Sequence, residues 1–84
     1  MSTPEPLRDV IRARLILLKR ERGLTSLEMA EQCGLAKASL DRYLAVAPIA
    51  TPGAATLFAI ASGMGVSIDW LCGRTEIRML RRAA

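Results

Sequence analysis

The sequence predicts an all-α domain of five short helices, and three observations favour this fold class. Apolar residues recur at the three- and four-residue spacing that marks one face of a helix. Helix-capping residues and glycines divide the chain at short intervals, as they do where successive helices begin and end. The chain has 84 residues, of which 51% are hydrophobic and only 4% aromatic, and this composition suits one small core of aliphatic side chains.

The first helix is expected to begin after a capping residue at Thr3, with Pro4 in its first turn, and to end at Gly23. A glycine suits that end because it adopts the left-handed backbone conformation at little steric cost. The apolar stripe that this helix should bury consists of Leu7, Val10, Ile11, Leu15 and Leu18.

Two very short helices follow, and they meet at a turn built on Gly34. Residues 25–28 read Thr-Ser-Leu-Glu, a capping box that places the second helix over 26–33. The third helix is expected over about 36–45. Two short helices joined by a glycine turn are typical of a helix-turn-helix unit, which we place at 26–45. Its inward positions are expected to be Met29, Ala30, Cys33, Leu35, Leu40, Tyr43 and Leu44.

Two further helices are expected in the second half of the chain. The fourth opens at Thr51 and Pro52 and ends at Gly65, and the fifth, over 68–72, is capped by Ser67. The buried face of the fourth helix should consist of Leu57, Phe58, Ile60, Ala61 and Met64.

Gly73 is the expected end of the domain, which then spans residues 1–73. Residues 74–84 are rich in arginine, and the sequence leaves two alternatives open for them. They form either a basic tail or a short sixth helix with Ile77 and Leu80 on one face.

Several classes of chemistry are excluded by what the sequence lacks. It has no histidine, which is the commonest general base and metal ligand, and no glycine-rich phosphate-binding motif. Cys33 and Cys72 are too few and too far apart for a zinc site or a disulfide framework, so we expect them to be reduced and buried. The sequence therefore predicts no catalytic residue, no metal, no cofactor and no small-molecule ligand.

A membrane-spanning segment is an alternative to the soluble helical domain, because no charged residue occurs from Tyr43 to Ile68. Pro48, Pro52 and Gly53 interrupt that stretch, so a loop followed by a core helix is the better interpretation. The N-terminal residues also lack the apolar region of a signal peptide. We therefore expect a soluble, cytoplasmic protein.

Two blocks of sequence, in this order and spacing, resemble one known family. The blocks are GLTSLEMAEQCGLAKASLDRYL at 23–44 and PGAATLFAIASGMGVSIDWLCG at 52–73. With the first helix, the resemblance to the Cro/lambda-repressor-like, XRE-type helix-turn-helix regulators covers roughly residues 7–73. The resemblance implies a five-helix domain that regulates transcription by binding double-stranded DNA.

The resemblance also implies which residues meet DNA, because the third helix of such a domain lies in the major groove. Lys37 and Arg42 are candidates for guanine or phosphate, and Asp41 should either accept from cytosine or orient Arg42. Ser39 and Ser26 are candidate phosphate donors, although Ser26 stands where the family often has a longer glutamine. The full set of candidate DNA-binding residues is Ser26, Lys37, Ala38, Ser39, Asp41 and Arg42.

Charge is distributed unevenly along this chain of net charge +4. Residues 1–23 carry +3, residues 24–73 carry −2 and residues 74–84 carry +3. Since affinity for DNA depends on neutralising phosphates, the two ends are expected to supply most of the electrostatic attraction.

The interpretation that fits these observations best is a sequence-specific repressor from a bacterium or phage. A homodimer is expected, with the apolar residues 44–50 as a candidate interface. The alternative is a helix-turn-helix fold that binds another protein, for example as an antitoxin. The basic ends favour DNA, whereas the negative centre favours the alternative.

Overall fold

The computed structural model describes residues 6–45 and 51–78, and within them the chain forms helices and no β-strand. The expected all-α fold with five helices is confirmed. The helices are α1 (Leu7–Glu21), α2 (Ser26–Cys33), α3 (Lys37–Leu44), α4 (Ala54–Met64) and α5 (Ile68–Leu71).

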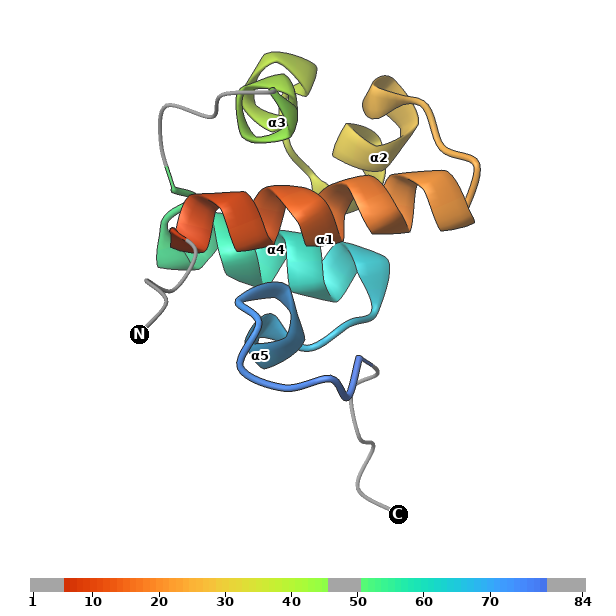
Figure 1. The fold of residues 1–84 in the computed structure, drawn as a ribbon. Helices are drawn as coiled ribbons and strands as arrows, with labels where there is room; N and C mark the ends of the chain where they lie inside the picture. The colour runs from red at the N-terminus through yellow and green to blue at the C-terminus, as the bar shows by residue number, and fades with distance from the viewer. Residues whose placement is uncertain (1–5, 46–50, 79–84) are drawn as a thin grey trace.

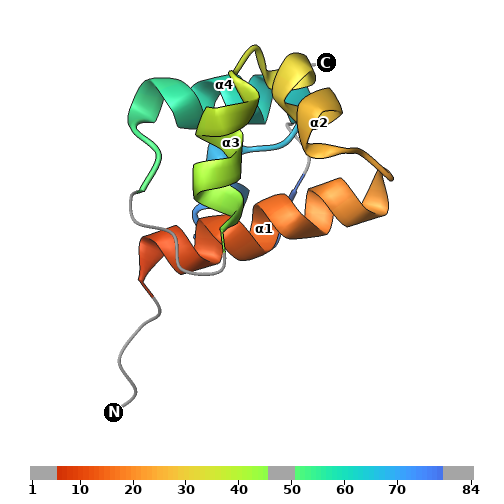
Figure 2. The same cartoon turned by 90° about the horizontal axis from the view of Figure 1, so that it is seen from above.

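The helices are stacked in three tiers (Figure 1). The helices α2 and α3 lie at the top, α1 and α4 cross the middle, and α5 lies at the bottom with the segment that follows it. Seen from above, α3 runs between α1 and α4 with α2 beside it (Figure 2). This arrangement leaves one side of α3 without a covering element among the described residues.

The helix α1 begins later than expected, since Leu7 is its first residue and Pro6 its N-cap. The carbonyl of Pro6 accepts hydrogen bonds from the amides of Asp9 and Val10 at 2.9 and 3.3 Å. A residue that precedes a proline is disfavoured in the helical conformation, so Pro6 sets this start. The expected cap, Thr3, lies outside the described residues.

The helix-turn-helix unit forms as the sequence predicts. The Thr25 hydroxyl accepts from the Glu28 amide at 3.1 Å, and the Glu28 carboxylate accepts from the Thr25 amide at 2.9 Å. These bonds hold the pKa of Glu28 below its ordinary value, since they favour the charged carboxylate. At the other end of α2, Gly34 adopts φ +69°, and Leu35 donates to the carbonyl of Ala30 at 2.9 Å. This left-handed turn directs the chain into α3.

The ends of the last two helices agree only partly with expectation. The helix α5 is capped as predicted, because the Ser67 hydroxyl accepts from the Trp70 amide at 2.9 Å. The cap expected at Thr51 is wrong, since α4 starts after Gly53, whose carbonyl accepts from the amide of Leu57. Residues 51–53 are not helical, so the chain after Pro52 remains extended for one more residue.

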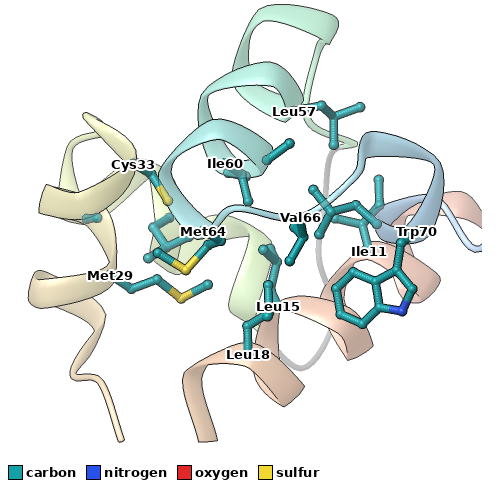
Figure 3. Close-up of a cluster of buried hydrophobic side chains, with 14 residues drawn as sticks. Ile11, Leu15, Leu18, Met29, Cys33, Leu57, Ile60, Met64, Val66 and Trp70 are labelled. Atoms are coloured by element: carbon teal, nitrogen blue, oxygen red, sulfur yellow. The ribbon is translucent and has the colours of Figure 1, made fainter. Parts of the chain in front are cut away.

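One apolar core unites all five helices (Figure 3). Two residues expected in it are exposed instead: Leu7 keeps 45% of its surface and Phe58 keeps 65%. Burial raises the pKa of the Cys33 thiol. The buried residues are Ile11, Leu15, Leu18, Met29, Ala30, Cys33, Leu40, Leu57, Ile60, Ala61, Met64, Val66, Trp70 and Leu71.

The segment 74–78 is not helical, and it is joined to α1 by the ion pairs Arg14–Glu76 and Glu21–Arg78 and to α5 by the hydrogen bond from the Arg74 amide to the Asp69 carbonyl. Its backbone is held because the Ser67 amide donates to the carbonyl of Arg78 at 2.8 Å. The sixth helix is therefore absent over 74–78, and Ile77 is 60% exposed. The rest of that proposed helix, 79–84, lies outside the described residues.

A membrane-crossing helix was one alternative for the uncharged central stretch. Among the residues that the structure describes, no helix has the length and apolar character needed to cross a bilayer.

Candidate nucleic-acid interface

The free side of α3 carries the residues that the sequence analysis selected. Lys37, Ala38 and Arg42 are exposed, while Ser39 and Asp41 are half-buried. The opposite side is anchored by Leu40, which is fully buried in the core. The periodicity of the helix therefore presents Lys37, Ala38, Asp41 and Arg42 on the side away from Leu40, as predicted.

An ion pair joins the first two turns of the outward face of α3. The Nζ atom of Lys37 lies 2.7 Å from Oδ2 of Asp41, and both side chains are about half exposed. The hydrogen bond from Lys37 holds the pKa of Asp41 below its ordinary value. In this structure Asp41 therefore pairs with Lys37, since residues four apart on a helix face one another whereas adjacent residues such as Asp41 and Arg42 do not.

Ser26 lies at the start of α2, close to this ion pair. The Ser26 hydroxyl and the Lys19 ammonium both lower the pKa of Asp41, although less than Lys37 does. The fold thus brings residues from α1, α2 and α3 to one place. Lys19 was missed as a candidate, because nothing in the linear spacing indicates that the end of α1 lies beside α3.

Arg42 is the cation on α3 that stays available. Within residues 6–45 and 51–78 its side chain forms no ion pair or hydrogen bond, whereas Lys37 is held by Asp41. A guanidinium without an internal partner keeps its five donors for a guanine edge or a phosphate.

Three arginines from the basic ends are engaged within the domain. The Nε atom of Arg12 donates to the carbonyl of Leu44 at 3.2 Å, at the C-terminal end of α3. Arg14 pairs with Glu76 at 3.2 Å. Arg78, in the segment 74–78, forms a two-pronged ion pair with Glu21 at the end of α1. These contacts make the three arginines structural elements of the fold.

The two paired arginines also frame the only tryptophan. The guanidinium carbons of Arg14 and Arg78 lie 4.7 and 4.9 Å from the centre of the Trp70 ring. Both distances allow a cation–π attraction. The described part of the C-terminal segment lies at the bottom of Figure 1, with α5, whereas α3 lies at the top.

A groove opens between the end of α1 and the helix-turn-helix unit. Its volume is about 500 Å³. It is lined by Ile16, Lys19, Arg20, Gly23, Leu24, Ser26 and Leu44. The groove thus combines a partly apolar floor with two cationic side chains and a hydroxyl, next to α3.

Metal ligation has no support in this part of the molecule. Over the two described ranges, no three Cys, Asp or Glu side chains gather as the ligands of a metal ion would. The two cysteines are free thiols, with Cys33 buried and Cys72 half-buried.

Comparison with known proteins identifies the family. A family model described as helix-turn-helix matches residues 15–71, which is more than half of the chain. No curated protein and no solved structure gave a match. The matched region contains α2, α3, α4 and α5, together with residues 15–21 at the end of α1. The chain therefore belongs to the helix-turn-helix family of XRE, or Cro/lambda-repressor-like, DNA-binding regulatory domains.

Proposed function

We propose that the protein is a sequence-specific transcriptional regulator that reads the major groove of double-stranded DNA with α3. The observation that carries this proposal is the free side of α3, where Arg42 is exposed and lacks an internal partner among the described residues. An α-helix fits the major groove, where each base pair presents a distinct pattern of donors and acceptors. Leu40, on the opposite side, fixes the orientation of the helix on the core.

The outward residues have complementary roles in this proposal. Arg42 makes a two-pronged contact with guanine, while the Ala38 methyl group lets the helix approach the bases or contacts a thymine methyl. Lys37 and Asp41 form a pair that can open, so that Lys37 turns to a phosphate and Asp41 accepts from cytosine. Ser39 and Ser26 donate to the backbone.

Replacing Arg42 with alanine tests the assignment of the reading helix. We expect Arg42→Ala to weaken binding by about 1–3 kcal/mol on a duplex selected from a random-sequence library, and to relax selectivity at one base pair. Arg74→Ala is the matched control, because it removes one exposed arginine near α5 and should leave selectivity unchanged. Fluorescence anisotropy at fixed salt measures both. Equal affinity and selectivity for wild type and Arg42→Ala would show that α3 does not read bases.

We assign the regulator the role of a cytoplasmic repressor. Occupying a promoter is enough to block transcription, whereas activation requires a further contact with the polymerase. Repression of a reporter behind the selected duplex, and its loss in Arg42→Ala, would support this role. Increased reporter expression would instead indicate an activator.

A homodimer completes the proposal, because two α3 helices about 34 Å apart would read two half-sites. The candidate interface at 44–50 lies almost wholly outside the described residues. A second candidate is the outer face of α4, where Phe58 is 65% exposed. The helix α4 contains no charged residue, so pairing two copies would bury no ionised side chain.

Replacing Phe58 separates these two interfaces. We expect Phe58→Ser to sediment as a monomer at concentrations at which the wild type is a dimer. Leu27→Ser is the control, because Leu27 is also half exposed but lies on α2, and it should remain dimeric. If Phe58→Ser sediments like the wild type, the dimer does not form through α4.

A further inference from the structure

We propose that the groove between the end of α1 and the helix-turn-helix unit is a phosphodiester site, in which Lys19 and Arg20 hold a backbone phosphate of the DNA. This inference rests on the proposed function and adds to it the source of the electrostatic attraction. It narrows the expectation that the two basic ends of the chain supply most of that attraction, because it assigns part of it to two residues at the end of α1.

The shape of the groove comes from the turn that ends α1. The amides of Gly23 and Leu24 donate to the carbonyls of Arg20 and Lys19 at 3.2 and 3.0 Å, which folds the chain back toward Ser26. Lys19 and Arg20 follow Ile16 by three and four residues, so all three share one face of α1. The turn therefore sets two cations opposite the first residue of α2.

Lys19 and Arg20 have no carboxylate partner among the described residues. Within the two described ranges, neither side chain forms an ion pair. By contrast, Arg12 donates to the Leu44 carbonyl and Arg14 pairs with Glu76, each at 3.2 Å. Arg78 pairs with Glu21 through two hydrogen bonds. Among the described residues, Arg22, Arg42 and Arg74 also lack an ion pair, but Lys19 and Arg20 are the two cationic side chains that line the groove.

If α3 enters the major groove of DNA, the groove on the protein lies beside one of the DNA strands that border it. Its lining residues come from the second half of α1, the turn after it, the start of α2 and the end of α3. Figure 2 shows how these helices are arranged on the side on which α3 is free. The phosphates that border the major groove of DNA contact the protein beside its reading helix. These phosphate contacts set the register of the helix on the DNA. The amide of Arg74 donates to the carbonyl of Asp69 in α5 at 2.8 Å, and α5 lies at the opposite end of the molecule from α3 (Figure 1).

The lining of the groove suits long cationic side chains. Ile16, Leu24 and Leu44 are half-buried and supply apolar surface for the aliphatic stems of Lys19 and Arg20. The Ser26 hydroxyl is an additional donor to a phosphate oxygen. Asp41 is the carboxylate close to Lys19, and its pairing with Lys37 reduces its repulsion of a phosphate.

The salt dependence of DNA binding tests this site. With a selected duplex and an unrelated duplex, we expect the slope of log K against log salt to flatten by about 1 in Lys19→Ala and in Arg20→Ala, and by about 2 in the double variant. The loss should be the same on both duplexes, because a phosphate contact carries no sequence information. Arg74→Ala, which removes the same charge, should keep the wild-type slope.

The outcomes separate this inference from the proposed function. Wild-type protein that binds no duplex at any salt concentration would defeat the proposed function, and the phosphate site with it. Wild-type binding with an unchanged slope in the double variant would defeat the phosphate site alone. An equal flattening in Arg74→Ala would also overturn it, since the effect would then reflect net charge. Circular dichroism confirms that each variant is folded before titration.

Discussion

Replacing Trp70 with alanine is expected to lower the free energy of unfolding by about 3–5 kcal/mol, the largest effect of a single substitution in this chain. Trp70 is 1% exposed and lies where α1, α5 and the segment 74–78 meet. Its loss would remove a large apolar surface and leave a cavity. It would also remove the ring that Arg14 and Arg78 face.

Urea unfolding followed by circular dichroism measures this change without relying on tryptophan fluorescence. Two further variants keep the experiment informative if Trp70→Ala does not fold. Trp70→Phe retains an aromatic ring and should lose less stability. Arg78→Ala should lose about 1–2 kcal/mol, because it removes a partly exposed ion pair with Glu21 and one cation–π contact with Trp70. If the urea midpoint of Trp70→Ala is close to that of the wild type, the packing of Trp70 between α1 and α5 does not contribute substantially to stability.

Replacing Gly63 with alanine is expected to cost about 1–3 kcal/mol of stability, although alanine usually favours a helix. A Cβ atom at Gly63 would lie 2.8 Å from the Cα of Cys33 and would contact the carbonyl oxygen of Gln32. Both are backbone atoms of α2, so α4 would have to move away from the helix-turn-helix unit. Gly63 is thus required by a close approach of two helices and not by its own backbone angle.

Ser62→Ala is the control for this second prediction. Ser62 lies on the exposed side of the same helix, and its replacement should leave stability unchanged or raise it by a few tenths of a kcal/mol, roughly as helix propensities indicate. The urea midpoints of Gly63→Ala and Ser62→Ala measure this difference in stability. If Gly63→Ala is as stable as Ser62→Ala, the packing of α2 on α4 tolerates the added methyl group.

The bounds of the helix-turn-helix unit were predictable because they depend on local chemistry. The capping box at Thr25 and Glu28 and the left-handed turn at Gly34 involve residues at most a few positions apart. Likewise, a period of about 100° per residue is enough to place Lys37, Ala38, Asp41 and Arg42 outward on α3. These features need no knowledge of the rest of the fold.

The burial of apolar residues was harder to predict where a helix is apolar on all sides. The helix α4 has no charged residue, so its sequence does not say which face meets α2 and α5. Phe58 was expected on the buried face with Leu57, but it lies about 100° away from Leu57 around the helix and is exposed. Leu7 is exposed because it lies in the first turn of α1, at the edge of the core.

The roles of the basic residues could not be predicted from the sequence, since they depend on contacts between distant segments. Glu21 and Arg78 are 57 residues apart, and Arg14 and Glu76 are 62 apart. Linear charge counts assigned these arginines to DNA, whereas the fold uses them internally. The same compaction brings Lys19 beside Ser26 and Asp41, and it thereby creates the groove that we assign to a phosphate.

The central claim is that α3 reads the major groove, and methylation interference on a selected duplex tests it most directly. Dimethyl sulfate modifies guanine at N7, in the major groove, and adenine at N3, in the minor groove. We predict that guanine N7 methylation within the site blocks binding of the wild type, and that adenine N3 methylation does not. We also predict that Arg42→Ala becomes insensitive at one guanine. Binding that is blocked only by adenine methylation, or no binding to any selected duplex, would contradict the claim.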